Sequence, residues 1–267
     1  IVPEDLLQQA NSMNQMGEAA GRTLGPLLAG ILIAARSAAF AFFGLAVVYT
    51  LSLIATIGLR VKHKRVTTSS SAISEIKDGL RHIRDTPVLK WTVLMMISVI
   101  FYGMIFPIVP AYAKEVLEVS EVKFGWMWGA LAIGQVTAAF IIVTRGGFKK
   151  LSRGIVFGAI VFSIGLIGFG LSKNYFLSLF MLFVIGMAFP LFVISVITLL
   201  QTHSKPEYLG RVMAVFAMSL QGASIGWILG GVLMDTVGNF ETVLITVAGG
   251  SIVVLITMVV SKEFRNA

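Results

Sequence analysis

Two opposite charges in the first apolar stretch of the chain are the first candidates for chemistry. Glu18 and Arg22 are four residues apart, so a helix would place both side chains on one face. Ionisable side chains inside an apolar span are costly and usually functional. The pair could serve in gating or in coupling. Alternatively, it is a structural ion pair at the mouth of the helix, one turn from the polar surface.

Three uncharged polar residues, Gln135, Thr137 and Gln221, stand among apolar neighbours further along the chain. If they face a water-filled cavity, they could hydrogen-bond a bound molecule. If they face a neighbouring helix, each would form an interhelical hydrogen bond worth about 0.6 kcal/mol. The sequence leaves both interpretations open.

Aromatic side chains gather near three prolines, Pro107, Pro110 and Pro190. They could form the wall of a site for a bulky amphipathic molecule, or they could face lipid. The members of this aromatic group are Phe101, Tyr102, Phe106, Tyr112, Phe189 and Phe192. Two tryptophans, Trp126 and Trp128, are expected to be anchors at a membrane surface instead.

Other kinds of chemistry have no support in the sequence. No nucleophile–base pair, phosphate-binding loop or metal-ligand spacing occurs, and there are no cysteines. The three histidines, His63, His82 and His203, all lie in basic, polar segments. We therefore predict no enzymatic activity, no metal site and no cofactor.

The elements that must position these residues suit a membrane. Hydrophobic residues make up 57% of the 267 residues, charged residues make up 13%, and the mean hydropathy is +0.90. Soluble domains carry about 25% charged residues. The composition therefore predicts an all-α integral membrane protein.

Eight apolar stretches reach the roughly 20 residues that a helix needs to cross a bilayer. We place them near residues 15–35, 38–59, 88–113, 124–144, 154–171, 175–200, 209–235 and 240–261. The first 16 residues are polar and are predicted to lead into the first helix. The three prolines fall in the third and sixth stretches, where we expect bends because proline removes a backbone donor.

A long polar segment separates the second and third spans. It opens with the basic run 60–65, and further on Ile73, Ile76, Leu80 and Ile83 fall on one helical face. Basic side chains occupy the other faces. This pattern predicts an amphipathic helix lying along the membrane surface.

The basic residues predict the orientation. Of 21 lysines and arginines, 16 lie in one set of loops, 4 lie in the alternate set, and Arg22 lies within a span. Loops rich in basic residues face the cytosol. We therefore expect a multi-pass protein of the cytoplasmic (inner) membrane with both ends of this chain in the cytosol. The same placement explains the net charge of +8 without nucleic acid.

One apolar stretch occurs twice, 201 residues apart, because residues 21–33 align with residues 222–234. The glycines of this repeat are Gly21, Gly25 and Gly30 in the first copy, and Gly222, Gly226, Gly230 and Gly231 in the second. Glycines four apart share a helix face and let a second backbone approach closely. Their recurrence half a chain apart indicates a duplicated helical membrane protein.

Several segments resemble the major facilitator superfamily, and within it the bacterial branch of the enterobactin exporter and the macrolide efflux proteins. Residues 2–12 resemble the entry to that branch's fifth helix, and Gly25-Pro26 through Gly30 is similar to the motif associated with antiporters. Residues 73–91 resemble its linker into the seventh helix, and residues 210–213 the entry to its eleventh. The resemblance covers essentially all of the chain as helices five to twelve of twelve.

The resemblance implies a partial major facilitator fold. Residues 1–59 would end the first six-helix half, residues 60–87 would be a cytoplasmic linker, and residues 88–267 would form the second half. It also implies a monomeric secondary transporter that works by alternating access and exports a small amphipathic molecule, a drug or a siderophore-like compound, in exchange for protons. The proton-carrying acids would lie in helices one and four. Because those helices are missing and the chain begins at Ile1, we expect a fragment or a chain that begins inside a larger protein.

One loop departs from the pattern of the family. The loop after the eighth helix normally carries Gly…Asp-Arg…Gly-Arg-Arg, whereas residues 145–153 are basic and glycine-containing but lack the acid.

Two other functions stay open at this point. A lysophospholipid flippase-like transporter cannot be separated from an exporter, and a non-transporting scaffold or receptor is a third possibility. Bent third and sixth spans with polar residues favour transport. The candidates for contact with substrate or for coupling are Glu18, Arg22, Gln135, Gln221, Phe106 and Phe189.

Overall fold

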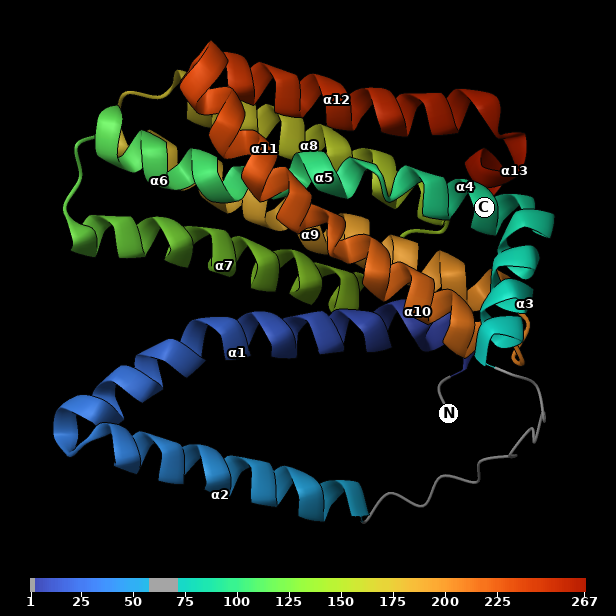
Figure 1. Ribbon diagram of the computed structural model, residues 1–267, viewed down its shortest axis with the longest axis horizontal. Coiled ribbons are helices and arrows are strands. Elements are labelled where there is room, and N and C mark those ends of the chain that lie inside the picture. The colour runs from blue at the N-terminus through green and yellow to red at the C-terminus, as the bar shows by residue number, and fades with distance from the viewer. Residues whose placement is uncertain (1–2, 58–71) are drawn as a thin grey trace.

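The computed structural model describes residues 3–57 and 72–267. Within these two ranges every regular element is helical, and most helices lie side by side along one direction, as Figure 1 shows. The helices are η1 (Glu4–Leu6), α1 (Leu7–Ala35), α2 (Ala38–Ile57), α3 (Ala72–Asp85), α4 (Pro87–Met95), α5 (Ser98–Gly103), α6 (Ile105–Glu115), α7 (Glu121–Arg145), α8 (Leu151–Leu171), α9 (Tyr175–His203), α10 (Leu209–Leu220), α11 (Gly222–Val237), α12 (Asn239–Val260) and α13 (Lys262–Asn266). The predicted all-α membrane fold is confirmed.

Seven helical segments of the described residues are long and apolar enough to cross a membrane. They are Ala39–Ile57, Pro87–Glu115, Val122–Arg145, Leu151–Leu171, Tyr175–His203, Leu209–Val237 and Asn239–Val260. Each corresponds to a predicted span. The remaining predicted span, 15–35, lies within α1, where many side chains fall outside the described residues, so its crossing of the membrane stays a prediction.

The polar start of the chain differs from expectation. Instead of leading into the first helix, most of it forms that helix, since α1 begins at Leu7. Ser12 and Gln15 of this segment are buried. Polar residues can occupy a helix here because their side chains pack against other elements rather than facing lipid.

The third predicted span is not one regular helix. It is interrupted at Met96 and Ile97 and again at Met104, which separates α4, α5 and α6. Both interruptions precede Pro107, which lies in the first turn of α6, where proline is tolerated. The seventh span is likewise interrupted at Gln221, between α10 and α11. By contrast, α9 continues through Pro190.

Local signals begin and end the helices. The Asn174 side chain accepts hydrogen bonds from the backbone amides of Phe176 (2.9 Å) and Leu177 (3.2 Å), which caps the start of α9. Helix α7 ends at Arg145 and is capped by Gly146, whose φ of 80° suits glycine. These caps fix the turns that bring α7, α8 and α9 together.

The second copy of the glycine repeat lies in a tight helix contact. A Cβ at Gly226 would overlap the carbonyl oxygen of Ile100 on α5, and one at Gly230 would come within 2.8 Å of the Pro107 ring. Backbone contact of this kind needs a residue without a side chain. The repeat therefore holds α11 against α5 and α6.

The first copy has no such contact within the described residues. A Cβ at Gly21 or Gly25 would have no atom within 4 Å. The surroundings of Pro26 and Gly30 fall outside what the structure describes. Helix α2 follows α1 at the edge of the molecule, and no residue of its apolar window is buried (Figure 1).

The predicted amphipathic helix is present as α3, which lies across the ends of the spanning helices in Figure 1. It packs on α10, where a Cβ at Gly79 would come within 2.8 Å of the Arg211 Cβ. Its predicted apolar face is divided, because Ile83 is buried and Leu80 is exposed. The side chains of Ile73 and Ile76 lie outside the described residues.

A histidine strengthens the contact between α3 and the start of α10. The His82 ring stacks on Tyr208 with centroids 4.6 Å apart, and the backbone amide of Lys205 donates to His82 Nε2 at 3.4 Å. Partial burial, followed by the nearby Lys205 charge, lowers the pKa of His82. Both effects favour the neutral ring, which can accept the hydrogen bond from Lys205.

Candidate functional site

A cavity of about 410 Å³ lies among the spanning helices. Its walls come from α5 to α11, so every lining residue belongs to the part of the chain after residue 88. Small-molecule sites typically measure about 300–1,000 Å³ and are mostly apolar, with a few polar groups. This cavity has the size and character of such a site.

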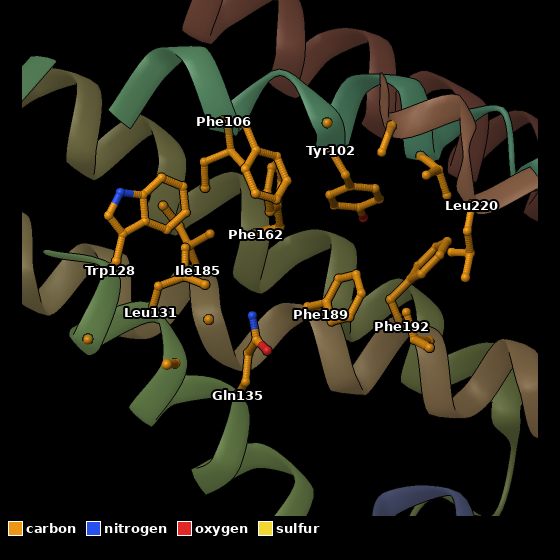
Figure 2. Close-up of a pocket in the computed structure, with 18 of the residues that line it drawn as sticks. Tyr102, Phe106, Trp128, Leu131, Gln135, Phe162, Ile185, Phe189, Phe192 and Leu220 are labelled. Atoms are coloured by element: carbon orange, nitrogen blue, oxygen red, sulfur yellow. The ribbon is translucent and has the colours of Figure 1, made fainter. Parts of the chain in front are cut away.

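Aromatic rings from five helices, α5 to α9, face one another across the cavity. Tyr102 lies edge-on to Phe162 with centroids 4.3 Å apart, and its ring is 5.2 Å from that of Phe192. Phe106 stacks on Trp128 at 5.6 Å. Figure 2 shows these rings around one space, with Phe189 across from them. Rings in these arrangements make a large, stiff apolar surface that suits a flat or bulky apolar group.

Polarity in the cavity comes from few side chains. Gln135 extends from α7 toward the space between the rings, and Tyr102 contributes its hydroxyl (Figure 2). Neither side chain hydrogen-bonds another described residue. The lining residues include no lysine, arginine, histidine, aspartate or glutamate. The site can therefore hydrogen-bond a ligand, but its walls offer no charged partner.

The structure brings together four of the six members of the predicted aromatic group, namely Tyr102, Phe106, Phe189 and Phe192. The other two lie elsewhere. The Phe101 ring fills the position that a Cβ of Gly249 on α12 would take, and the Tyr112 hydroxyl donates to the Gly170 carbonyl at 3.2 Å. Helix periodicity explains the division, because residues 101 and 112 project from other faces than residues 102 and 106.

The predicted polar residues are also divided. Gln135 lines the cavity, whereas Gln221 is exposed at the junction of α10 and α11 and is not among the lining residues. The Thr137 hydroxyl donates to the Ile133 carbonyl of its own helix at 2.8 Å. Of the three, Gln135 is thus the one placed to contact a ligand.

The charged candidates of the first helix lie outside the cavity lining. Glu18 is exposed on α1 and has an interaction partner, while the side chain of Arg22 falls outside the described residues. Their proposed pairing stays a prediction.

Trp128 is a lining residue that sequence reasoning assigned elsewhere. Expected as a surface anchor, it faces Phe106 in the cavity, whereas Trp126 is 63% exposed. Helical spacing could have found it, since Trp128, Ala132 and Gln135 follow each other at i, i+4 and i+7 on one face of α7.

Metal chemistry has no candidate in the described ranges, where no group of three or more His, Cys, Asp or Glu side chains is arranged to hold an ion.

Comparison with known proteins agrees with the fold. The family model of the Major Facilitator Superfamily matches residues 1–225. An uncharacterized MFS-type transporter of Bacillus subtilis (strain 168), YfiS, is 27% identical over 261 residues, which cover 89% of this chain and 60% of that relative. The chain thus spans about three fifths of the length of the relative. Members of this superfamily are transporters rather than enzymes. With seven apolar helical segments among its described residues and a family match across most of its length, the chain belongs to the major facilitator superfamily.

Proposed function

We propose that this chain is part of a secondary active transporter that exports a small amphipathic molecule by alternating access. The observation that carries the proposal is the aromatic cavity with Gln135 at its wall. Transporters of this architecture place their substrate sites near the membrane midplane between helices. The cavity lies among the interrupted helices α5, α6, α10 and α11, where backbone irregularity is tolerated because it lines a cavity.

The residues that line the cavity indicate which class of substrate it would bind. Aromatic rings favour a bulky apolar body, and Gln135 and Tyr102 favour one or two hydrogen-bonding groups. A fully charged group would leave water without a partner of opposite charge in this lining, which is costly. We therefore favour a drug-like molecule over a lysophospholipid, whose phosphate would need such a partner. A siderophore-like compound would also fit, provided that its uncharged part enters this cavity. We therefore still propose that the chain is related to the branch of the enterobactin exporter and the macrolide efflux proteins.

Coupling and orientation are further parts of the proposal. The cavity lining contains no carboxylate, so a proton would be carried elsewhere in the complete transporter. The proposed residence is the cytoplasmic (inner) membrane, with both ends of this chain cytosolic, because 16 of 21 basic residues lie in one set of loops. We propose a monomer, in which residues 1–59 and 88–267 belong to two halves that move against each other.

A transport assay tests this function. Cells that produce the natural protein carrying this chain are loaded with a lipophilic fluorescent dye, and dye loss is followed with and without a protonophore. We expect dye loss that the protonophore stops. Energised movement of a labelled lysophospholipid without dye efflux would favour the lipid alternative, and movement of neither would favour the scaffold.

A binding assay addresses the cavity directly. The dye should quench tryptophan fluorescence of the purified protein, and Trp128→Phe should abolish most of this quenching because Trp128 lines the cavity. Trp126→Phe is the matched control, since Trp126 is exposed two residues away. Equal loss in both variants would contradict the assignment of the cavity.

A further inference from the structure

One contact of the structure is used neither by the cavity nor by the glycine repeat. It joins the polar first turns of α1 to the loop between α7 and α8 and to the end of α9, on the side of the molecule where α3 lies (Figure 1). It consists of Gln8 and Asn11 on one side, and Phe148, Thr198 and Gln201 on the other. We name this set the amide clasp.

Gln8 pairs with backbone rather than with another side chain. Its Nε2 donates to the Phe148 carbonyl at 2.9 Å, and its Oε1 accepts from the Phe148 amide at 3.0 Å. A primary amide can make both bonds to one peptide residue, as a neighbouring β-strand would. The contact therefore depends on the carboxamide and not on a charge.

Two glycines shape the loop for this contact. Gly146 and Gly147 have φ values of 80° and 74°, a region that favours glycine. A Cβ at Gly147 would also overlap the Gln8 carboxamide. The unusual Gly-Gly pair of this basic loop is thus explained by the approach of Gln8.

Asn11 extends the clasp by one turn. Its Nδ2 donates to Thr198 Oγ1 at 3.1 Å and to Gln201 Oε1 at 2.8 Å, both on α9. Thr198 is buried, so the contact is shielded from solvent on the α9 side. Further along α1, Met16 packs on an apolar cluster that includes Ile142 and Ile194.

Gln9, which lies between the two α1 residues of the clasp, is not fully satisfied. The Gln9 Oε1 atom is buried without a hydrogen-bond partner among the described residues. A buried acceptor without a partner opposes the contact. The first turns of α1 therefore combine the well-formed bonds of the clasp with the opposing cost of Gln9, which suits a contact that must open and close rather than one that is permanent.

We propose that the amide clasp holds the α3 side of the transporter closed and that Gln8 is its positioning residue. This inference rests on the proposed alternating-access function, because α1 would belong to one moving half and α7 to α9 to the other. The clasp is made of neutral groups, although the loop around it carries the exposed charges Arg145 and Lys149. Its closure should therefore be insensitive to salt.

Distance measurement by double electron–electron resonance tests the proposal without any substrate. Spin labels replace Met13 on α1 and Arg153 on α8, both exposed, in the natural protein carrying this chain. The wild type should show a dominant short distance. Gln8→Ala and the similar-sized Gln8→Met should both raise the ratio of long to short distances by about tenfold, as expected for two lost hydrogen bonds. Gly147→Ala keeps Gln8 but adds a Cβ that overlaps its carboxamide, so it should also raise the ratio of long to short distances.

The matched control is Asn14→Ala, which removes an exposed amide from the same helix. It should keep the wild-type distances. The proposal is overturned if Gln8→Met keeps them too, because packing alone would then hold the contact, or if Asn14→Ala opens it equally. Raising salt from about 0.1 to about 1 M shortens the screening length from about 10 to about 3 Å. Opening by salt would assign the contact to the charges of the loop and would also overturn the proposal. Because these distances need no ligand, failure of dye export leaves the result interpretable.

Discussion

At the scale of single residues, the cavity obtains its shape and its polarity from different side chains. Rings such as Phe106 and Phe162 supply apolar surface, while Gln135 supplies a carboxamide that no other described residue satisfies. A site with an unpaired polar group discriminates well against ligands that cannot pair with it, because the group then stays buried and unsatisfied. Gln135 should therefore make the cavity prefer ligands with a hydrogen-bonding group, more than it raises the affinity for all ligands.

This reasoning predicts the effect of Gln135→Leu. The variant should bind a dye with one hydrogen-bonding group and its analogue without that group about equally, whereas the wild type should prefer the former by about tenfold. Quenching of Trp128 fluorescence measures both dissociation constants. The control is Gln221→Leu, an exposed amide outside the cavity lining. Unchanged preference in Gln135→Leu would show that its amide does not face the ligand.

The residues of the site were partly predictable. Gln135 and four aromatic residues were found because polar and aromatic types are informative inside apolar spans. The orientation of each span about its own axis was not predictable. For that reason the predicted aromatic group includes Phe101 and Tyr112, which lie elsewhere, and Trp128 is predicted at the membrane surface instead of in the cavity. In a membrane helix that is apolar all round, the sequence carries little information on which face points inward.

At the scale of elements, the glycine repeat shows what a repeated pattern can and cannot predict. Both copies predict close helix contact, and the second copy has it, since Gly226 meets the backbone of α5. The first copy has no described atom near Gly21 or Gly25. A glycine pattern predicts that one face of a helix can accept a second helix, while the presence of that second helix depends on the rest of the fold.

The interruptions at residues 96–97 and 104 were not predicted at those positions, because prolines mark a bend only approximately.

Two glycines of α11 provide a matched test of this packing. Gly226→Leu would force a side chain into the Ile100 carbonyl and should destabilise the protein by about 3 kcal/mol or more. Gly231→Leu should be tolerated, because a Cβ at that position meets no described atom within 4 Å. Thermal unfolding and the monodisperse yield in detergent compare the two variants. Similar losses in both would show that the contact with α5 is not special.

At the scale of the whole molecule, charge and topology agree with each other. The chain reverses direction from one span to the next, so that α3, the α7–α8 loop and the start of α10 gather at one end, together with the C-terminus (Figure 1). Among the described residues, this end carries most of the lysines and arginines, including those of α3. Seven of the eight predicted spans, and their order, are found among the described residues, because recognising a span needs only its length and hydropathy. The close packing of α3 on α10 and the residues before it, through Gly79 and His82, was not predictable, because it depends on which helices become neighbours.

The end that faces the cytosol can be tested by labelling. The chain has no cysteine of its own, so single cysteines can be introduced into a version of the natural protein without other thiols. Glu207→Cys, before α10, and Ser120→Cys, before α7, are both exposed positions at opposite ends of the spanning helices. In intact cells an impermeant thiol reagent should label the cysteine at position 120 and spare the one at position 207, which should react only after the membrane is opened. The reverse pattern would place the basic loops outside, against the rule that such loops stay in the cytosol. It would also turn the amide clasp into a gate on the outer side.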